Sequence, residues 1–210
     1  QQLAAISERV EQLVARAYDI FLRDLRPALA EHGVVLSTWE GLDPAEQAHL
    51  REVFDQRIFP ILTPLAVDPS HPFPEISNLS LNLALRVVDP DDDEERFARL
   101  KLPPSLPRFF ATSDPHRFIP LEDLVAAHLD RLFVGMRIEE HQTFRVTRNA
   151  DLVLSEEDPE DLLELVEMEI RRRRFGDAVR LEVPVAMSDE MVSLLQRELD
   201  VADVHHHVAP

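Results

Sequence analysis

Apolar residues near the start of the chain recur every three or four positions, which is the spacing of one helix face. The first stripe runs from Leu3 to Leu25 and predicts a long helix that Pro27 kinks or ends. A second stripe follows Asp43 and Glu46, which stand at the spacing of a capping box. Two helices joined by a short link predict an N-terminal αα-hairpin.

Prolines are concentrated between residues 60 and 77, where each fixes its own φ angle and removes a backbone donor. We therefore predict an extended connector here, and neither a helix nor a central strand. Leucines at every second position from Leu79 to Leu85 then predict a half-buried strand that opens a new domain. The predicted division is helices at 1–59, a connector at 60–77, an α+β domain at 78–204 and the start of a further link at 205–210.

In the rest of the chain, segments with an apolar residue at every second position alternate with segments that have the apolar spacing of a helix. Strands are predicted near residues 78–88, 97–102, 108–112, 117–119, 137–148 and 179–185, and helices near 121–135, 158–174 and 188–199. The first four strands are neighbours in sequence, which predicts a meander, and helices are inserted only later. This order favours an α+β fold, in which an αα-hairpin precedes a mostly antiparallel or mixed sheet with helices on one face.

The charge balance limits the possible partners. Among 210 residues, 40 are Asp or Glu and 22 are Lys or Arg, which gives a formal net charge of −18. Such a field repels nucleic acid and phosphate chains, so a polyanion could bind only at a local basic groove. A sheet that binds RNA would also need exposed aromatics and a basic face, whereas this chain has one Tyr and one Trp. We therefore expect no nucleic-acid partner.

The sequence lacks the common motifs of catalysis and metal binding. It has four glycines and no glycine-rich phosphate loop, no GxSxG elbow and no HExxH motif. The acidic run from Asp89 to Glu95 lacks the ligand spacing of a Ca²⁺ loop, so we interpret it as a solvated turn and predict no metal site. His128, beside an apolar helix stripe, is interpreted as a packing histidine. The absence of cysteine and of any membrane-length apolar run favours a cytoplasmic location.

Arginines are the candidate binding residues. Arg145 and Arg148 lie near the end of a predicted strand, where Thr147 and Asn149 could add neutral hydrogen bonds to a phosphate chain. Three positions apart, the two arginines fall on opposite faces of a regular strand, so only a bend would bring them together. The structural alternative is that Arg148 pairs with Asp151, and Arg145 with a carboxylate at the edge of the core.

Four further arginines at 171–174 end a predicted helix, where cations complement the negative end of the helix dipole. Helix capping and ion pairing account for most of them. Arg174, next to Phe175 and Gly176, is the one that could line a surface between domains.

Three stretches have a combination of residues that goes beyond these general patterns. They are FPILTPLAVDPSHPFPEISNLSLNLAL at 59–85, FRVTRNADL at 144–152, and RRRFG at 172–176 followed by VRLE at 179–182. All three resemble bacterial polyphosphate kinase, the histidine-phosphorylating family that moves the γ-phosphate of ATP onto polyphosphate and back. The resemblance implies that the chain holds the last helices of an N-terminal helical domain and then the middle, or head, domain.

This resemblance carries further expectations. It implies an enzyme that uses ATP and Mg²⁺, with its phosphohistidine and catalytic residues outside this chain, so the chain alone is expected to be inactive and to bind no cofactor. It implies roles in dimerisation and in the wall of a polyphosphate channel, with polyphosphate, ATP, ADP, the family's catalytic C-terminal domains and a second copy as partners. The implied polyphosphate contacts are Arg145, Arg148 and Asn149, with Arg174 and Thr147 as secondary candidates.

A second interpretation stays open. A non-catalytic protein-interaction or dimerisation module would leave a similar amphipathic pattern, because both kinds of domain bury apolar faces against another chain.

Overall fold

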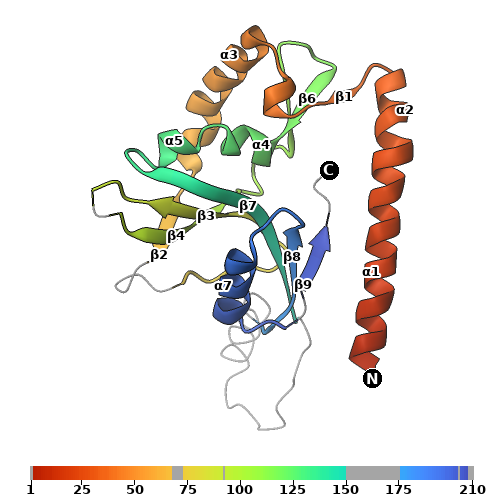
Figure 1. The fold of residues 1–210 in the computed structure, drawn as a ribbon. Helices are drawn as coiled ribbons and strands as arrows, with labels where there is room; N and C mark the ends of the chain where they lie inside the picture. Colours follow the sequence, from red (N-terminus) through yellow and green to blue (C-terminus); the bar gives the residue numbers. More distant parts are fainter. Residues whose placement is uncertain (1, 68–72, 92, 150–175, 203, 208–210) are drawn as a thin grey trace, which may run out of the picture.

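A computed structural model describes residues 2–67, 73–91, 93–149, 176–202 and 204–207 of the chain. The predicted helix near 158–174 therefore lies outside the described residues, as do Asp151 and Arg174. In the described part, a twisted six-stranded sheet forms the centre, and a long helix stands along one side of it (Figure 1).

The main sheet has the strand order β2-β4-β3-β7-β8-β9. Its strands are β2 (Pro64–Val67), β3 (Leu81–Val88), β4 (Glu95–Lys101), β7 (Arg137–Arg148), β8 (Ala178–Pro184) and β9 (Val204–His207). Neighbouring strands are antiparallel except β8 and β9, which are parallel. The proline-rich connector thus contributes an edge strand, β2, which is where proline is tolerated in a sheet.

A small second sheet has the order β1-β6-β5 and joins distant parts of the chain. Its strands are β1 (Val35–Leu36), β5 (Phe109–Ala111) and β6 (Arg117–Pro120). The predicted meander is therefore interrupted, because β3 pairs with β4 and β5 pairs with β6, but β4 and β5 belong to different sheets. Pro103, Pro104 and Pro107 lie between β4 and β5, and their missing backbone donors end the first ladder there.

The described helices are α1 (Gln2–Ile20), α2 (Arg26–Glu31), α3 (Pro44–Val53), α4 (Leu121–Ala126), α5 (Leu129–Leu132) and α7 (Asp189–Leu199). A π-helical turn at Phe21–Leu25 connects α1 to α2, so Pro27 falls in the first turn of α2, where proline is tolerated. The capping box of Asp43 and Glu46 is confirmed at the start of α3. Among the described helices, none combines the length and the apolar character needed to cross a membrane.

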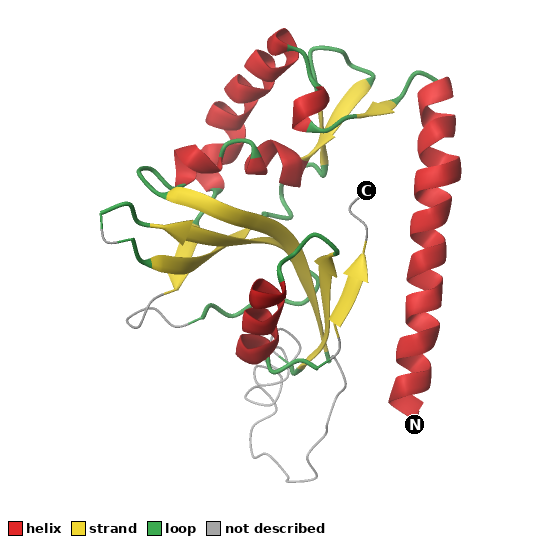
Figure 2. Ribbon diagram, in the orientation of Figure 1, coloured by secondary structure: helices red, strands yellow, loops and turns green. Residues whose placement is uncertain are grey.

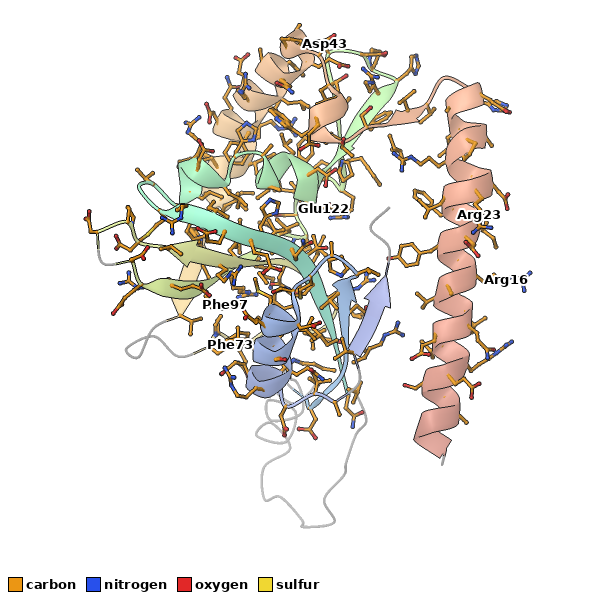
Figure 3. All side chains as sticks on the ribbon, in the orientation of Figure 1. Arg16, Arg23, Asp43, Phe73, Phe97 and Glu122 are labelled. Carbon is orange, nitrogen blue, oxygen red and sulfur yellow. The ribbon has the colours of Figure 1, made fainter. Side chains whose placement is uncertain are left out.

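Two apolar clusters lie on opposite faces of the main sheet. On one face, Leu83 and Leu85 of β3 pack with Phe54 and with residues of α3, α4 and α5. On the other face, Phe144 and Leu181 pack with α7, and Phe73 stacks on Phe97 beside them with ring centroids 5.3 Å apart (Figure 3). The α+β class and the mixed, mostly antiparallel sheet are confirmed. Helices cover both faces, however, and not one face as expected, because both faces of the central strand β3 carry apolar side chains.

The two N-terminal helices also differ from the expected hairpin. Figure 2 shows α1 and α2 as one rod that is separated from α3 by the small sheet and its loops. Gly33, at φ 80°, ends α2, and the chain then pairs β1 with β6 before α3 begins. Because Leu50 and Ile58 belong to the same cluster as Leu83, α3 packs on the main sheet instead of on α1. The predicted domain boundary near residue 60 stays a prediction.

Candidate functional site

A cavity of about 1000 Å³ lies on the side of the main sheet that faces α1. Helix α1 reaches it through Tyr18, and strands β3, β7 and β8 provide its opposite wall. The lining residues are Tyr18, residues 77–81, residues 101–104, Leu106, Arg108, Leu121, Glu122, residues 143–145 and Glu182. A volume of this size is in the range of small-ligand sites.

Cations outnumber carboxylates on the wall of the cavity. Lys101, Arg108 and Arg145 line it, against Glu122 and Glu182. Two of the cations are paired: Arg108 Nη2 lies 2.6 Å from Glu122 Oε1, and Arg145 Nε lies 2.9 Å from Glu182 Oε2. In a chain with a net charge of −18, this cavity is therefore a local exception to the acidic background.

Tyr18 is the contact that brings α1 into the site. Burial raises the pKa of its hydroxyl, and the nearby charges of Arg145, Glu182 and Arg180 add smaller effects of both signs. Arg180 Nη2 lies 3.6 Å from Glu182 Oε1, so Glu182 stands between two arginines. The tyrosine therefore stays neutral at physiological pH and does not add negative charge to the cavity.

The predicted site residues are not brought together. Arg145 lines the cavity, and its side chain is 46% exposed. Arg148 does not line it, but donates from Nε to Ile76 O at 2.7 Å and from Nη1 to Gly176 O at 2.8 Å. The pairing of β7 with β8 shifts between Thr147 and Arg148, yet this irregularity does not make the two arginines converge on one space.

The remaining candidates lie at the end of β7 or beyond the described part. Thr147 is half-buried and pairs with Arg180 in the β7–β8 ladder. Asn149 is exposed, and its backbone N–H donates to Asp177 O at 2.8 Å. Arg174 lies outside the described residues. The pairing of Arg145 with a carboxylate matches the structural alternative. The expected pairing of Arg148 with Asp151 falls on a residue outside the described part and stays a prediction. A polyphosphate-contact role for these residues stays a prediction.

Sequence reasoning missed Lys101, Arg108 and Tyr18 as residues of this site. Lys101 is the single lysine of the chain, and this isolation was the one signal that could have drawn attention to it. The partner that makes it part of the site, Ser77, is 24 positions away and meets it only through the fold.

His128 is confirmed as a packing histidine. It is 4% exposed, stacks on Phe54 with ring centroids 4.4 Å apart and meets the Trp39 ring edge-on at 4.8 Å. Its Nδ1 lies 2.8 Å from Leu124 O, and burial lowers the pKa of the imidazole. It does not line the cavity.

Metal binding finds no support in the described part of the chain, where no group of three or more His, Asp or Glu side chains is placed to hold an ion. The cavity has hydroxyl, amide and cationic groups instead, which are donors to an anion.

Comparison with known proteins identifies the family. The profile described as "Polyphosphate kinase middle domain" matches residues 45–209. The chain belongs to the polyphosphate kinase family. It is 52% identical to the polyphosphate kinase of Mycolicibacterium gilvum over 208 residues and 50% identical to that of Streptomyces coelicolor. These alignments cover 96% and 99% of this chain but 28% of each relative, so the chain spans under a third of their length.

The fold of the polyphosphate kinase family is confirmed by a solved structure. The crystal structure of polyphosphate kinase from Porphyromonas gingivalis matches with a TM-score of 0.77 at 27% identity, over 98% of this chain and 30% of that one. The resemblance inferred from the three sequence stretches is therefore confirmed.

Proposed function

We propose that this chain is the middle part of a polyphosphate kinase that transfers phosphoryl groups between ATP and polyphosphate. In the proposed reaction, a histidine outside residues 1–210 takes the γ-phosphoryl group of ATP and releases ADP. The phosphoryl group then passes to a terminal oxygen of polyphosphate, which lengthens by one unit, and each step runs in reverse as well. The names of the relatives and the match to the middle-domain profile support this proposal.

ATP and Mg²⁺ belong to the whole enzyme in this proposal. Phosphoryl transfer uses Mg²⁺ to neutralise phosphate oxygens, and the ion is held largely by the nucleotide and by carboxylates. We assign no residue of this chain to Mg²⁺, because the donor groups around the cavity suit an anion and not a cation. We also assign no residue to the adenosine of ATP. The chain alone is proposed to be inactive.

The role proposed for this chain is to form part of the wall along which polyphosphate passes. The observation that carries the proposal is the excess of cations over carboxylates in a cavity of a strongly acidic chain. Of the predicted contacts, Arg145 is the best placed, because its guanidinium lines the cavity and is 46% exposed. Arg148 and Asn149, with Thr147 and Arg174 as secondary candidates, are proposed as contacts further along the same polymer.

The test is polyphosphate synthesis by the full-length enzyme with Arg145→Ala or Arg148→Ala. We expect Arg145→Ala to raise the KM for polyphosphate about threefold to tenfold, because a charged hydrogen bond partly offset by Glu182 is lost. The KM for ATP should not change. Arg148→Ala should also lower thermal stability, because Ile76 O and Gly176 O lose their charged donor.

The matched control is Arg197→Ala, which removes another exposed arginine that is paired with a neighbouring glutamate, Glu198, at 3.2 Å. It should leave both KM values unchanged. If the Arg145 and Arg148 variants kept the polyphosphate KM and its salt dependence of the unchanged enzyme, the channel-wall role would be rejected.

We further propose that the chain packs against the catalytic C-terminal domains of the enzyme and takes part in a homodimer in the cytoplasm. Exposed apolar residues on α1 support such contacts: Ile6, Leu13 and Ile20 are 59%, 51% and 47% exposed and lie seven positions apart on one side of the helix. Sedimentation of the full-length enzyme with Leu13→Glu tests whether this face supports the dimer, which should then dissociate at a higher protein concentration than the dimer of the unchanged enzyme.

A further inference from the structure

Three cations surround the short segment that enters β3. Lys101 Nζ donates to Ser77 Oγ at 3.0 Å, and Arg148 Nε donates to Ile76 O at 2.7 Å. The third cation, Arg99, reaches the segment indirectly, through hydrogen bonds of the Asn82 side chain. This segment, residues 76–80, provides four of the residues that line the cavity.

Arg99 is buried behind the cavity wall, with 6% of its surface exposed. Its Nε donates to Asn82 Oδ1 at 2.9 Å, and Asn82 Nδ2 in turn donates to Ser80 O at 2.8 Å and lies 3.1 Å from Ser80 Oγ. Arg99 Nη2 finds no hydrogen-bond partner among the described residues. A chain of hydrogen bonds therefore leads from a buried guanidinium to a serine on the cavity wall.

Among the described residues, none of these three cations lies within ion-pair distance of a carboxylate. Arg145 and Arg108, on the other side of the same cavity, each have a glutamate partner. Carboxylates outnumber Lys and Arg in the chain by 40 to 22, so unpaired cations in one place are not explained by a lack of acidic residues. Burying a cation without a counter-charge costs free energy, which an anionic ligand would recover.

We propose that a phosphate group binds at the Lys101 end of the cavity, between Lys101 Nζ and the hydroxyl group of Ser77. This proposal rests on the proposed function and deepens it, because it gives the polymer a defined contact point. Lysine is a common phosphate ligand as a point charge, and the Ser77 hydroxyl, which accepts from Lys101, can donate its own proton to a second phosphate oxygen. Arg99 acts through Asn82 as a positioning residue, and its charge favours the anion without touching it.

The segment has the rigidity that a preorganised site needs. Leu79 has a φ of 57°, in the left-handed region that non-glycine residues seldom occupy, and its N–H donates to Val146 O at 2.8 Å. Ser80 Oγ donates to Ser77 O at 2.8 Å, which closes the turn on itself. The arrangement of donors is therefore set before a ligand arrives.

The experiment measures binding of inorganic tripolyphosphate to the 210-residue chain by calorimetry. We expect saturable binding that weakens about tenfold or more in Lys101→Ala, because a charged contact is lost, and within about threefold in Lys101→Arg, which keeps the charge. The control is Arg16→Ala, which removes a cation that points outward from α1 and should leave binding unchanged (Figure 3).

A second measurement locates the site without any variant. In the unchanged chain, tripolyphosphate should shift the amide resonances of Ser77 and Ser80 more than those of α1.

ATP is the other source of phosphate groups, and it should bind less tightly than tripolyphosphate because its adenosine has no proposed contact here.

Four results would overturn the proposal: no saturable binding, equal binding by Lys101→Ala, amide shifts centred elsewhere, or tighter binding of ATP. These results are independent of the test of the proposed function. Loss of tripolyphosphate binding in Lys101→Ala, with an unchanged polyphosphate KM in both Arg145→Ala and Arg148→Ala, would keep this site and reject the channel wall. The reverse pattern would reject this site alone.

Discussion

Two buried charges in this chain are surrounded in opposite ways. Where α3 meets the small sheet, Glu46 is 4% exposed and accepts hydrogen bonds from Asp43 N at 3.0 Å, Thr112 Oγ1 at 2.8 Å and Arg117 Nη1 at 3.0 Å. Beside the cavity, Arg99 is 6% exposed, and the described residues offer it one amide oxygen and no carboxylate. The burial is similar, but one charge is compensated and the other is not.

This difference separates a charge that stabilises the fold from one that prepares a site. Glu46 joins the start of α3 to β5 and β6, so its neighbours in space come from segments more than sixty positions later in the chain. The three hydrogen bonds that Glu46 accepts offset the free-energy cost of burying its charge. Among the residues that the structure describes, nothing comparable accounts for the burial of Arg99, which is why we assign it to ligand binding. Substitutions at three positions test this contrast.

The largest expected effect is that of Glu46→Ala, which should lower the free energy of unfolding by about 2–3 kcal/mol. The loss is smaller than for a fully buried ion pair, because the Arg117 side chain is 34% exposed and can be hydrated. Urea unfolding measures it. The control is Glu52→Ala, an exposed position on the same helix, for which we expect a change within about 0.5 kcal/mol.

The pH dependence of this effect has a definite sign. The hydrogen bond from Asp43 N, followed by those of Thr112 and Arg117, holds the pKa of Glu46 below its usual value of 4.5. A lowered folded-state pKa gives stability that is present above the unfolded-state pKa and is lost as the pH falls through the folded-state value. The deficit of Glu46→Gln should therefore shrink on acidification, and an equal deficit at neutral and acidic pH would contradict this account.

An intermediate effect on the unfolding free energy is expected at Asp123, a half-buried carboxylate whose surroundings, like those of Arg99, disfavour its charged form. Burial, with Glu122 and Glu40 nearby, raises its pKa to about 6 from 3.8. The folded state thus binds a proton more tightly than the unfolded state, so stability falls as the pH rises from about 4 to about 6. Asp123→Asn should raise the unfolding free energy by about 1 kcal/mol at neutral pH, after allowance for screening by water, and by less at pH 4.

Thermal unfolding across this pH range checks the Asp123 prediction. Asp130→Asn, an exposed position nearby in the sequence, is the control. A gain in stability that is the same at both ends of the range would show that ionisation of Asp123 is not its cause.

The smallest effect on stability, and the sharpest test of the contrast, is expected for Arg99→Met. Replacing an uncompensated buried charge by an apolar side chain of similar length should change the unfolding free energy by no more than about 1 kcal/mol, in either direction. Tripolyphosphate binding should nevertheless weaken. A loss of stability as large as that of Glu46→Ala, with unchanged binding, would make Arg99 a structural residue like Glu46.

Local features of the fold were predictable from the sequence because their causes are local. The capping box of Asp43 and Glu46 and the strand at 137–148 each depend on residues a few positions apart, and each is present. The family was predictable for the same reason, since three continuous stretches carry its signature.

The candidate site was not predictable in this way. Arg145 was found because arginine suits phosphate and lies near the end of a predicted strand, but its partner Glu182 is 37 positions later. Lys101 and Ser77 meet across 24 positions, and the two arginines at the end of β7 separate because Arg148 is held by Ile76 O and Gly176 O. The spacing of apolar residues along the sequence does not predict contacts between side chains that are this far apart in the chain.

The sequence by itself determined the kinds of element, most of their limits, the acidic character of the chain and its family. Only the tertiary structure decided that α3 packs on the main sheet and not on α1, that helices cover both faces of that sheet, and which cations have no carboxylate among their described neighbours. The physical reason is the separation along the chain of the residues that interact. Helix caps and periodic faces depend on residues a few positions apart, whereas burial and charge compensation depend on groups that become neighbours only when the sheet has formed.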